Sequence, residues 1–236
     1  MTLPILDTPT YSCVLPSSKE RIEFRPFLVG EQKVLMIAQE SDDQASQIRE
    51  MIRLINACCD DVTAETLPTT DLEWLFLQIR IKSVGETSDV TMKCTKCETE
   101  NTCTIDLEAA NVKYPEKEVS NIVKLTNDIS IELQFANYEA MKGLDLTAEE
   151  TSTKDAFILM QRCIMAVIEG DEVMTRDDFN EKEMTRFMDS MSLDMLEGVQ
   201  EYLSSAPSLS VTAEFKCNNC EDQQETSLEG IGNFFA

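Results

Sequence analysis

The chain has 236 residues, of which 42% are hydrophobic, so it is long enough for one large domain or two small ones with a substantial core. It carries 44 acidic and 20 basic residues, which gives a formal net charge of −24. Proteins bind phosphate backbones mainly through Lys and Arg. This charge therefore disfavours binding to nucleic acid or to an anionic membrane, and it favours protein partners.

Histidine is absent and there are nine cysteines. The chain therefore lacks the commonest general base, and a tetrahedral zinc site would need Cys alone or Cys with carboxylate. An odd cysteine count in a chain of this length favours metal binding and burial over disulfides. The sequence contains no run of eighteen apolar residues, so we predict no membrane helix. The first residues lack the basic and apolar regions of a secretory signal, so we expect the protein to fold in the cytosol.

The first third of the chain predicts one strand and three helices. Prolines make residues 1–18 an extended, poorly anchored arm. Residues 21–29 alternate apolar and polar side chains, which predicts an edge strand that contains Pro26 and ends at Gly30. Helical periodicity follows over 31–41, 42–60 and 70–85.

In the middle and at the end of the chain, predicted strands alternate with predicted helices. Strand-like runs surround the first Cys pair and continue through 119–125 and 129–135, which are joined by the tight-turn pair Asn127-Asp128. Residues 151–169 are apolar on most sides and predict one buried helix. A short strand is expected at 171–175, two amphipathic helices follow, and the chain returns to strand character after Pro207.

Two pairs of residues have the spacing of a capping box, Thr70 with Glu73 and Asn180 with Glu183. The acidic pairs Asp60-Asp61, Glu149-Glu150 and Asp177-Asp178 are interpreted as solvated helix flanks rather than catalytic carboxylates. The methionines of 184–195 have helical spacing, so we interpret them as core rather than as an adaptable binding surface.

These elements predict an α+β protein, in which a helical bundle carries a small antiparallel β part with a split Cys₄ zinc-ribbon-like unit. We expect one compact domain built from consecutive segments. The segments are an N-terminal arm (1–18), a strand with helices (19–85), a β-rich segment with the first Cys pair (86–136), a helical block (137–207) and a segment with the second Cys pair and the tail (208–236).

The β-rich parts contain an approximate repeat. "MKCTKCETENTCTIDLE" at 92–108 and "FKCNNCEDQQETSLEG" at 215–230 both place Lys before Cys-x-x-Cys, Glu after it, and a Leu-Glu pair further on. Two thiolates at a hairpin tip can bind one zinc ion, and two such tips complete a tetrahedral Cys₄ site. The predicted ligands of a structural Zn²⁺ are Cys94, Cys97, Cys217 and Cys220.

Two alternatives compete with a structural zinc site. A thioredoxin-like redox pair needs a helix N-terminus after a strand, but strand-like residues lie on both sides of Cys94 and Cys97. A zinc-ribbon regulator that binds nucleic acid needs a basic face, but the charge near both pairs is acidic. The remaining thiols, including Cys58, Cys59, Cys103 and Cys163, are expected to be buried as small hydrophobic groups.

Four stretches stand out together: "LPILDTPTY" (3–11), "RPFLVGEQKVLMIA" (25–38), "LPTTDLEWLFLQIRIKSVGE" (67–86) with the following CxxC hairpin, and the C-terminal CxxC unit that ends in "FF". In these stretches the chain resembles the baseplate hub and hub-assembly proteins of T-even-like contractile-tailed bacteriophages. The resemblance extends over nearly the whole chain. It departs from the common knuckle pattern at Glu98 and Glu221, where Gly often follows the second Cys.

The resemblance implies a non-enzymatic role in assembly or structure of the baseplate hub, with other hub proteins and the tape-measure protein as partners. It implies neither nucleic acid nor membrane as partner, and it carries over no catalytic residue. It places the protein in the host cytoplasm during assembly, and it leaves open whether the protein stays in the virion baseplate or is released as an assembly chaperone. The arm "LPILDTPTY" and the tail "GNFF" (232–235) are candidate contact segments, with packing onto the core as the equal alternative.

Overall fold

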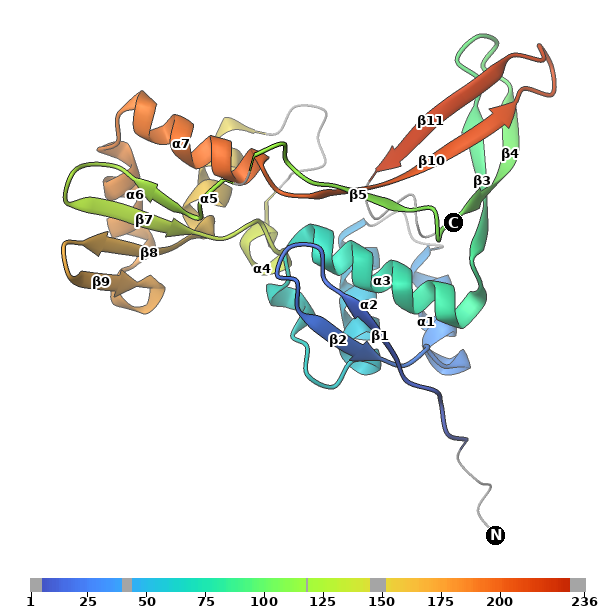
Figure 1. The fold of residues 1–236 in the computed structure, drawn as a ribbon, viewed down its shortest axis with the longest axis horizontal. Coiled ribbons are helices and arrows are strands. Elements are labelled where there is room, and N and C mark those ends of the chain that lie inside the picture. The colour runs from blue at the N-terminus through green and yellow to red at the C-terminus, as the bar shows by residue number, and fades with distance from the viewer. Residues whose placement is uncertain (1–5, 40–43, 118, 145–151, 230–236) are drawn as a thin grey trace. The chain divides into compact units, whose positions relative to one another are not determined.

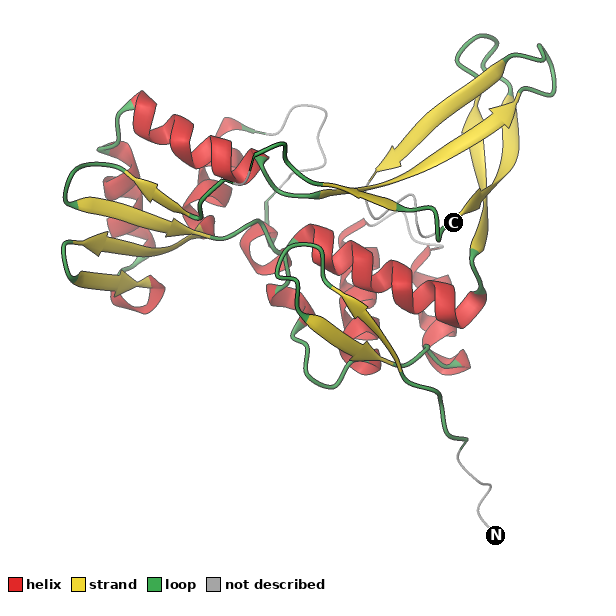
Figure 2. Cartoon of the chain, viewed as in Figure 1, coloured by secondary structure: helices red, strands yellow, loops and turns green. Residues whose placement is uncertain are grey.

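The computed structural model describes residues 6–39, 44–117, 119–144 and 152–229, and it is an α+β structure with small antiparallel sheets (Figures 1 and 2). Contacts divide the chain into two units. Unit 1 contains residues 1–64, 70–113 and 207–236, and unit 2 contains residues 65–69 and 114–206. Unit 2 is therefore inserted in the sequence of unit 1. The predicted segments follow other boundaries, and their grouping into one compact domain stays a prediction.

Unit 1 begins with a hairpin and three helices. Its first elements are β1 (Tyr11–Val14), β2 (Arg21–Phe24), α1 (Val29–Gln39), α2 (Gln44–Cys58) and α3 (Thr69–Val84), with the 3-10 turn η1 (Ala64–Thr66) before α3. The three predicted helices are confirmed, and Gly85 follows α3 with a φ of +131°, a conformation that favours glycine.

Two expectations for the N-terminal part are wrong. Residues 11–14 are not an unanchored arm, because β1 pairs antiparallel with β2 and Leu15 is buried behind it. The strand predicted over 21–29 ends at Phe24, and α1 begins at Val29. The Glu31 carboxylate accepts a 2.6 Å hydrogen bond from the Leu28 N–H, so the start of α1 is capped where we expected a strand. Residues 1–5 lie outside the described part.

The rest of the β part of unit 1 is built around two hairpins that are far apart in the sequence. The first joins β3 (Thr87–Lys93) to β4 (Glu100–Asp106), and the second joins β10 (Ser208–Lys216) to β11 (Gln223–Glu229). β5 (Asn111–Lys113) extends the second sheet beside β10. Figure 1 shows the two hairpins side by side with their turns at the same end.

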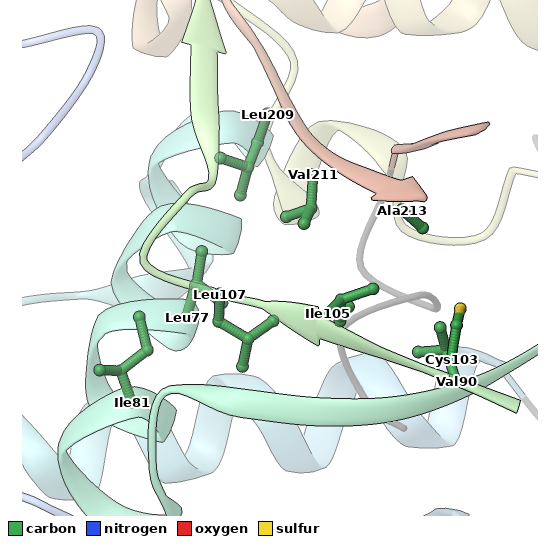
Figure 3. Packing of buried hydrophobic residues seen from close by; sticks show 9 residues of the cluster. All are labelled: Leu77, Ile81, Val90, Cys103, Ile105, Leu107, Leu209, Val211 and Ala213. Atoms are coloured by element: carbon green, nitrogen blue, oxygen red, sulfur yellow. The ribbon is translucent and has the colours of Figure 1, made fainter. Parts of the chain in front are cut away.

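The hairpins pack on α3 through alternating inward side chains. Val90, Cys103 and Ile105 come from the first hairpin, and Val211 and Ala213 come from the second. Figure 3 shows them with Leu209 and with Leu77 and Ile81 of α3. Buried and exposed residues alternate along β3, β4 and part of β10. The buried side chains of these strands therefore form one thin apolar layer between the hairpins.

Unit 2 is a four-stranded antiparallel sheet in the order β6-β7-β8-β9. The strands are β6 (Ile122–Lys124), β7 (Ile129–Leu133), β8 (Ile164–Glu169) and β9 (Glu172–Thr175). The helices are α4 (Tyr138–Met141), α5 (Thr153–Cys163), α6 (Glu181–Asp189) and α7 (Leu193–Ser204), with the 3-10 turn η2 (Arg176–Asp178) before α6.

The core of unit 2 lies between the sheet and these helices. Ile131 and Ile164 of the sheet pack with Met184, Met188 and Val199 of α6 and α7. Both methionines are buried, as predicted for the Met-rich stretch. The tight turn at Asn127-Asp128 and the strand before Arg176 are also confirmed.

The helix predicted over 151–169 is wrong in its second half. α5 ends at Cys163, and residues 164–169 form β8, which pairs with β7 and β9. The run "IMAVIE" is rich in apolar and β-branched side chains, so its continuous hydrophobicity reflects a central strand rather than a buried helix. Periodicity alone does not separate these two cases.

The two capping boxes have different outcomes. Asn180 accepts hydrogen bonds from the N–H groups of Lys182 and Glu183, and Glu183 returns one to the Asn180 N–H, as predicted. Thr70 instead lies inside α3, and its buried hydroxyl donates to the Pro207 carbonyl of unit 1. The pair Glu149-Glu150 and the tail 232–235 lie outside the described residues.

Candidate metal centre

The four predicted ligands come together at the tips of the two hairpins. The first tip, residues 94–99, is called knuckle 1, and the second tip, residues 217–222, is called knuckle 2. In each hairpin these six residues lie between a strand that ends in Lys and the strand that follows. In each knuckle the first Cys is buried and the second is half-buried. The tertiary fold therefore joins thiols that are about 120 residues apart in sequence.

The backbones of the two knuckles match closely. In knuckle 1, the Cys94 N–H donates to the Thr99 carbonyl at 2.9 Å and the Glu98 N–H donates to the Cys94 carbonyl at 2.9 Å. In knuckle 2, the Cys217 N–H donates to the Asp222 carbonyl at 2.9 Å and the Glu221 N–H donates to the Cys217 carbonyl at 3.0 Å. The repeat seen in the sequence is thus a repeat of one turn geometry.

Glu98 and Glu221 each follow the second Cys of a knuckle, where a zinc knuckle often has Gly. Their φ angles are +58° and +59°, in the left-handed region that glycine adopts most easily. A non-glycine residue there costs about 1–2 kcal/mol. The departure from the pattern therefore leaves the turn unchanged, at a cost in backbone strain.

The sulfur atoms have the spacing of metal ligands. Cys94 Sγ lies 3.6 Å from Cys220 Sγ, and Cys97 Sγ lies 3.5 Å from Cys217 Sγ. All four sulfurs lie within 4.8 Å of one another. A disulfide would need about 2.05 Å. Tetrahedral zinc with Zn–S bonds of about 2.3 Å places its sulfurs about 3.8 Å apart, so the observed spacing fits a shared ion.

Local hydrogen bonds favour the thiolate form of two of these cysteines. The hydroxyl and the backbone of Thr99 lower the pKa of Cys97 to about 6. The backbone N–H groups of Cys220 and Asn219 lower the pKa of Cys217. For Cys220 the Asp222 backbone also acts to lower the pKa, but burial and the neighbouring thiols raise it to about 12. Four adjacent thiols cannot all ionise without a cation, and Zn²⁺ would supply that charge.

One residue that the sequence reasoning missed connects the knuckles. Asn101 is 2% exposed, and its side-chain amide donates to the Thr99 carbonyl at 2.8 Å while Cys217 Sγ lies 3.7 Å away. Its side-chain oxygen accepts a 2.8 Å hydrogen bond from the Asn218 N–H. Asn101 therefore orients both knuckles. The signal in the sequence was a polar residue at an inward position of an alternating strand.

Further polar contacts join the outer sides of the knuckles. Gln224 accepts a 2.9 Å hydrogen bond from the Thr95 N–H, and Lys96 pairs with Asp222 at 3.3 Å. Each of the three lysines beside the site has a carboxylate partner, since Lys93 lies 3.9 Å from Glu100 and Lys216 lies 3.0 Å from Glu221. The knuckle surface therefore presents paired charges and no uncompensated basic face.

The other cysteines have separate places. Cys103 is buried on β4, and its equivalent in the second hairpin is Thr226. Cys58, Cys59 and Cys163 are buried, and burial raises the pKa of each thiol, to about 12 for the first two and about 11 for Cys163. Their expected role as packed, unreactive groups is consistent with these shifts.

A family model described as T4 bacteriophage base plate protein matches residues 8–236. The chain belongs to this family. The comparison found no matching curated protein and no matching solved structure. The match includes both hairpins, so the paired knuckles are part of the region that identifies a baseplate protein. Within the described part of this baseplate protein, no helix is both long and apolar enough to cross a membrane.

Proposed function

We propose that this baseplate protein is a non-enzymatic part of the central hub and acts in hub assembly through contacts with other hub proteins and the tape-measure protein. The family match supports the baseplate, and the resemblance of residues 25–38 and 67–86 supports the hub. A net charge of −24 and lysines paired with carboxylates at the knuckles favour protein partners over nucleic acid.

The proposal includes a structural Zn²⁺ held by Cys94, Cys97, Cys217 and Cys220. The observation that carries it is the set of four sulfurs within 4.8 Å, held by two matching turns. The ion would connect the hairpin that follows α3 with the hairpin near the C-terminus. In this reading the metal fixes the fold of unit 1 and leaves contacts with partners to the protein surface.

A CxxC thiol oxidoreductase is the chemical alternative. Both Cys pairs lie at hairpin tips rather than at the N-terminus of a helix, where the dipole would activate one thiol. Elemental analysis of reduced protein purified without added zinc separates the two readings. We expect close to one zinc per chain; a ratio near zero together with disulfide-reductase activity that Cys94→Ser abolishes would favour the oxidoreductase.

The hub assignment is tested by co-purification from infected cells. We expect the tagged chain to retain hub and tape-measure proteins in the host cytoplasm before tails are complete. Mass spectrometry of mature particles then decides between a virion subunit and a released chaperone. A chain that stays monomeric in the lysate, without a baseplate partner, would contradict the proposal.

A further inference from the structure

Unit 2 contains a groove far in sequence from the knuckles. Its walls are α5 and α6, its end is formed by residues at η2, and its volume is about 830 Å³. Phe157 is 39% exposed at the edge of the groove, and the half-buried side chains of Ile158 and Phe179 contribute further apolar surface. A groove of this size between two helices can accept several side chains of a peptide segment.

The charges of the groove are arranged on opposite walls. Lys154, Arg162 and Arg176 line the side of α5 and η2, whereas Glu181 and Asp189 line the side of α6. Three cations therefore line one wall in a chain with 20 basic and 44 acidic residues. This wall is complementary to a segment that carries carboxylates beside its apolar side chains.

Hydrogen bonds hold two of these cations in place. Arg162 donates to the carbonyls of Ala140 at 3.0 Å and Lys142 at 2.7 Å, and Arg176 donates to the Arg162 carbonyl. These bonds tie the Arg162 guanidinium to backbone at the end of α4 and the Arg176 guanidinium to backbone at the end of α5, so a ligand carboxylate would meet groups whose side-chain entropy is already reduced.

We propose that the α5–α6 groove binds a short amphipathic segment of another baseplate protein, with apolar side chains against Phe157, Ile158 and Phe179 and carboxylates toward Lys154 and Arg176. A second copy of this chain is a poorer occupant because two chains of charge −24 repel each other. The proposal rests on membership of the baseplate family and on the groove, and it depends neither on the hub assignment nor on zinc.

Photo-crosslinking in infected cells identifies the occupant. Benzoylphenylalanine placed at Thr185, on the groove wall, should crosslink a baseplate protein through a segment with carboxylates next to apolar residues. The same probe at Val173, which is 56% exposed on β9 outside the groove lining, is the matched control and should not give that product. A crosslink to a baseplate protein outside the hub would support the groove while contradicting the hub assignment. Crosslinks to residues 145–151, to a second copy, or to nothing would overturn the groove proposal.

Affinity measurements with the identified segment as a synthetic peptide give the second test. Phe157→Glu and Lys154→Glu in the full chain should each weaken binding by about tenfold or more. Their controls, Val173→Glu and Lys182→Glu, introduce the same changes in unit 2 outside the groove lining and should change the Kd less than about twofold. Equal effects in test and control variants, with unchanged melting temperatures, would overturn the proposal.

Discussion

The β strands of both units bury apolar side chains, but the two units differ in what those strands pack against. In unit 2, a four-stranded sheet buries Ile131, Leu133 and Val167 against the helices. In unit 1, two hairpins bury a thin layer that ends in thiols and in the amide of Asn101. A two-stranded hairpin is marginal by itself, and the proposed zinc ion would add a cross-link between the two tips. The comparison therefore predicts that the β part of unit 1 depends on metal, whereas the sheet of unit 2 depends on apolar burial.

The largest expected effect is the loss of the metal site. Cys94→Ser or Cys217→Ser should remove zinc and lower the free energy of unfolding by several kcal/mol, because metal binding and folding are coupled. Elemental analysis and thermal melting measure this effect, and a strong chelator should reproduce it in the wild type. Cys13→Ser, outside the cluster, is the control. Unchanged melting temperatures in both ligand variants would break the comparison.

Shortening a core side chain of unit 2 should lower the stability of the protein, and removal of metal should not change that loss. Ile131→Ala removes a side chain that is 0% exposed, so the expected loss is about 2–5 kcal/mol from lost burial and the resulting cavity. Denaturant unfolding with and without chelator measures it. The loss should be the same in both conditions, and zinc content should stay at its wild-type value. A metal-dependent loss at Ile131 would show that the two β parts do not differ in the way described.

Asn101 is expected to support the proposed zinc site of unit 1 through its hydrogen bonds to both knuckles. Asn101→Ala removes the hydrogen bonds to Thr99 and Asn218, so zinc affinity should fall by about 10–100-fold. Competition with a metal indicator dye measures the affinity. Asn121→Ala, an exposed asparagine on unit 2, is the matched control and should leave the affinity unchanged. Equal affinities in both variants would remove Asn101 from the site.

Asp71, in the helical part of unit 1, should make the stability of the fold depend on pH. Its carboxylate accepts hydrogen bonds from the Ser17 N–H at 2.8 Å and from the Ser17 hydroxyl, and its side chain is 0% exposed. Burial raises the pKa of Asp71 above its usual value, and the Ser17 hydrogen bonds only partly oppose this shift. The folded state then holds a proton that the unfolded state has released. The stabilisation from that proton is full below the ordinary Asp pKa and is lost as pH rises through the raised value.

The variant Asp71→Asn tests the predicted direction in which stability changes with pH. It keeps an acceptor for the Ser17 N–H and cannot ionise, so the stability of the wild type relative to the variant should increase as the pH falls toward the Asp71 pKa. Asp71→Ala should lose about 1–3 kcal/mol because it leaves the half-buried donors of Ser17 without this acceptor. Urea unfolding at several pH values measures both. The opposite slope would mean that the hydrogen bonds outweigh burial.

The smallest effect is expected at the left-handed residue of knuckle 1. Glu98→Gly relieves strain in the folded turn but increases the entropy of the unfolded chain, so the net change should be under about 1 kcal/mol. Glu98→Val should be less stable than Glu98→Gly, because a β-branched residue tolerates this φ poorly. Thermal melting of both zinc-loaded variants measures the difference. Equal melting temperatures would show that the turn relaxes.

The sequence by itself determined the local features that have a short-range cause. Periodicity predicted α2 and α3, the repeat of 92–108 and 215–230 predicted two hairpins with Cys pairs at their tips, and the spacing at Asn180 predicted the cap of α6. Hydrogen bonds between residues a few positions apart define all of these, so they are visible in a short window.

Only the tertiary structure decided the features that depend on distant partners. The run 164–169 is a strand because β7 and β9 lie on its two sides, and Thr70 is tied to Pro207 rather than to its own helix start. Asn101 joins the knuckles because the fold places Asn218 opposite it. Apart from the tight β8–β9 hairpin, each of these contacts closes a long loop of chain. The burial that offsets the entropy cost of closing such a loop involves residues far apart in sequence, so a short window of sequence does not show it.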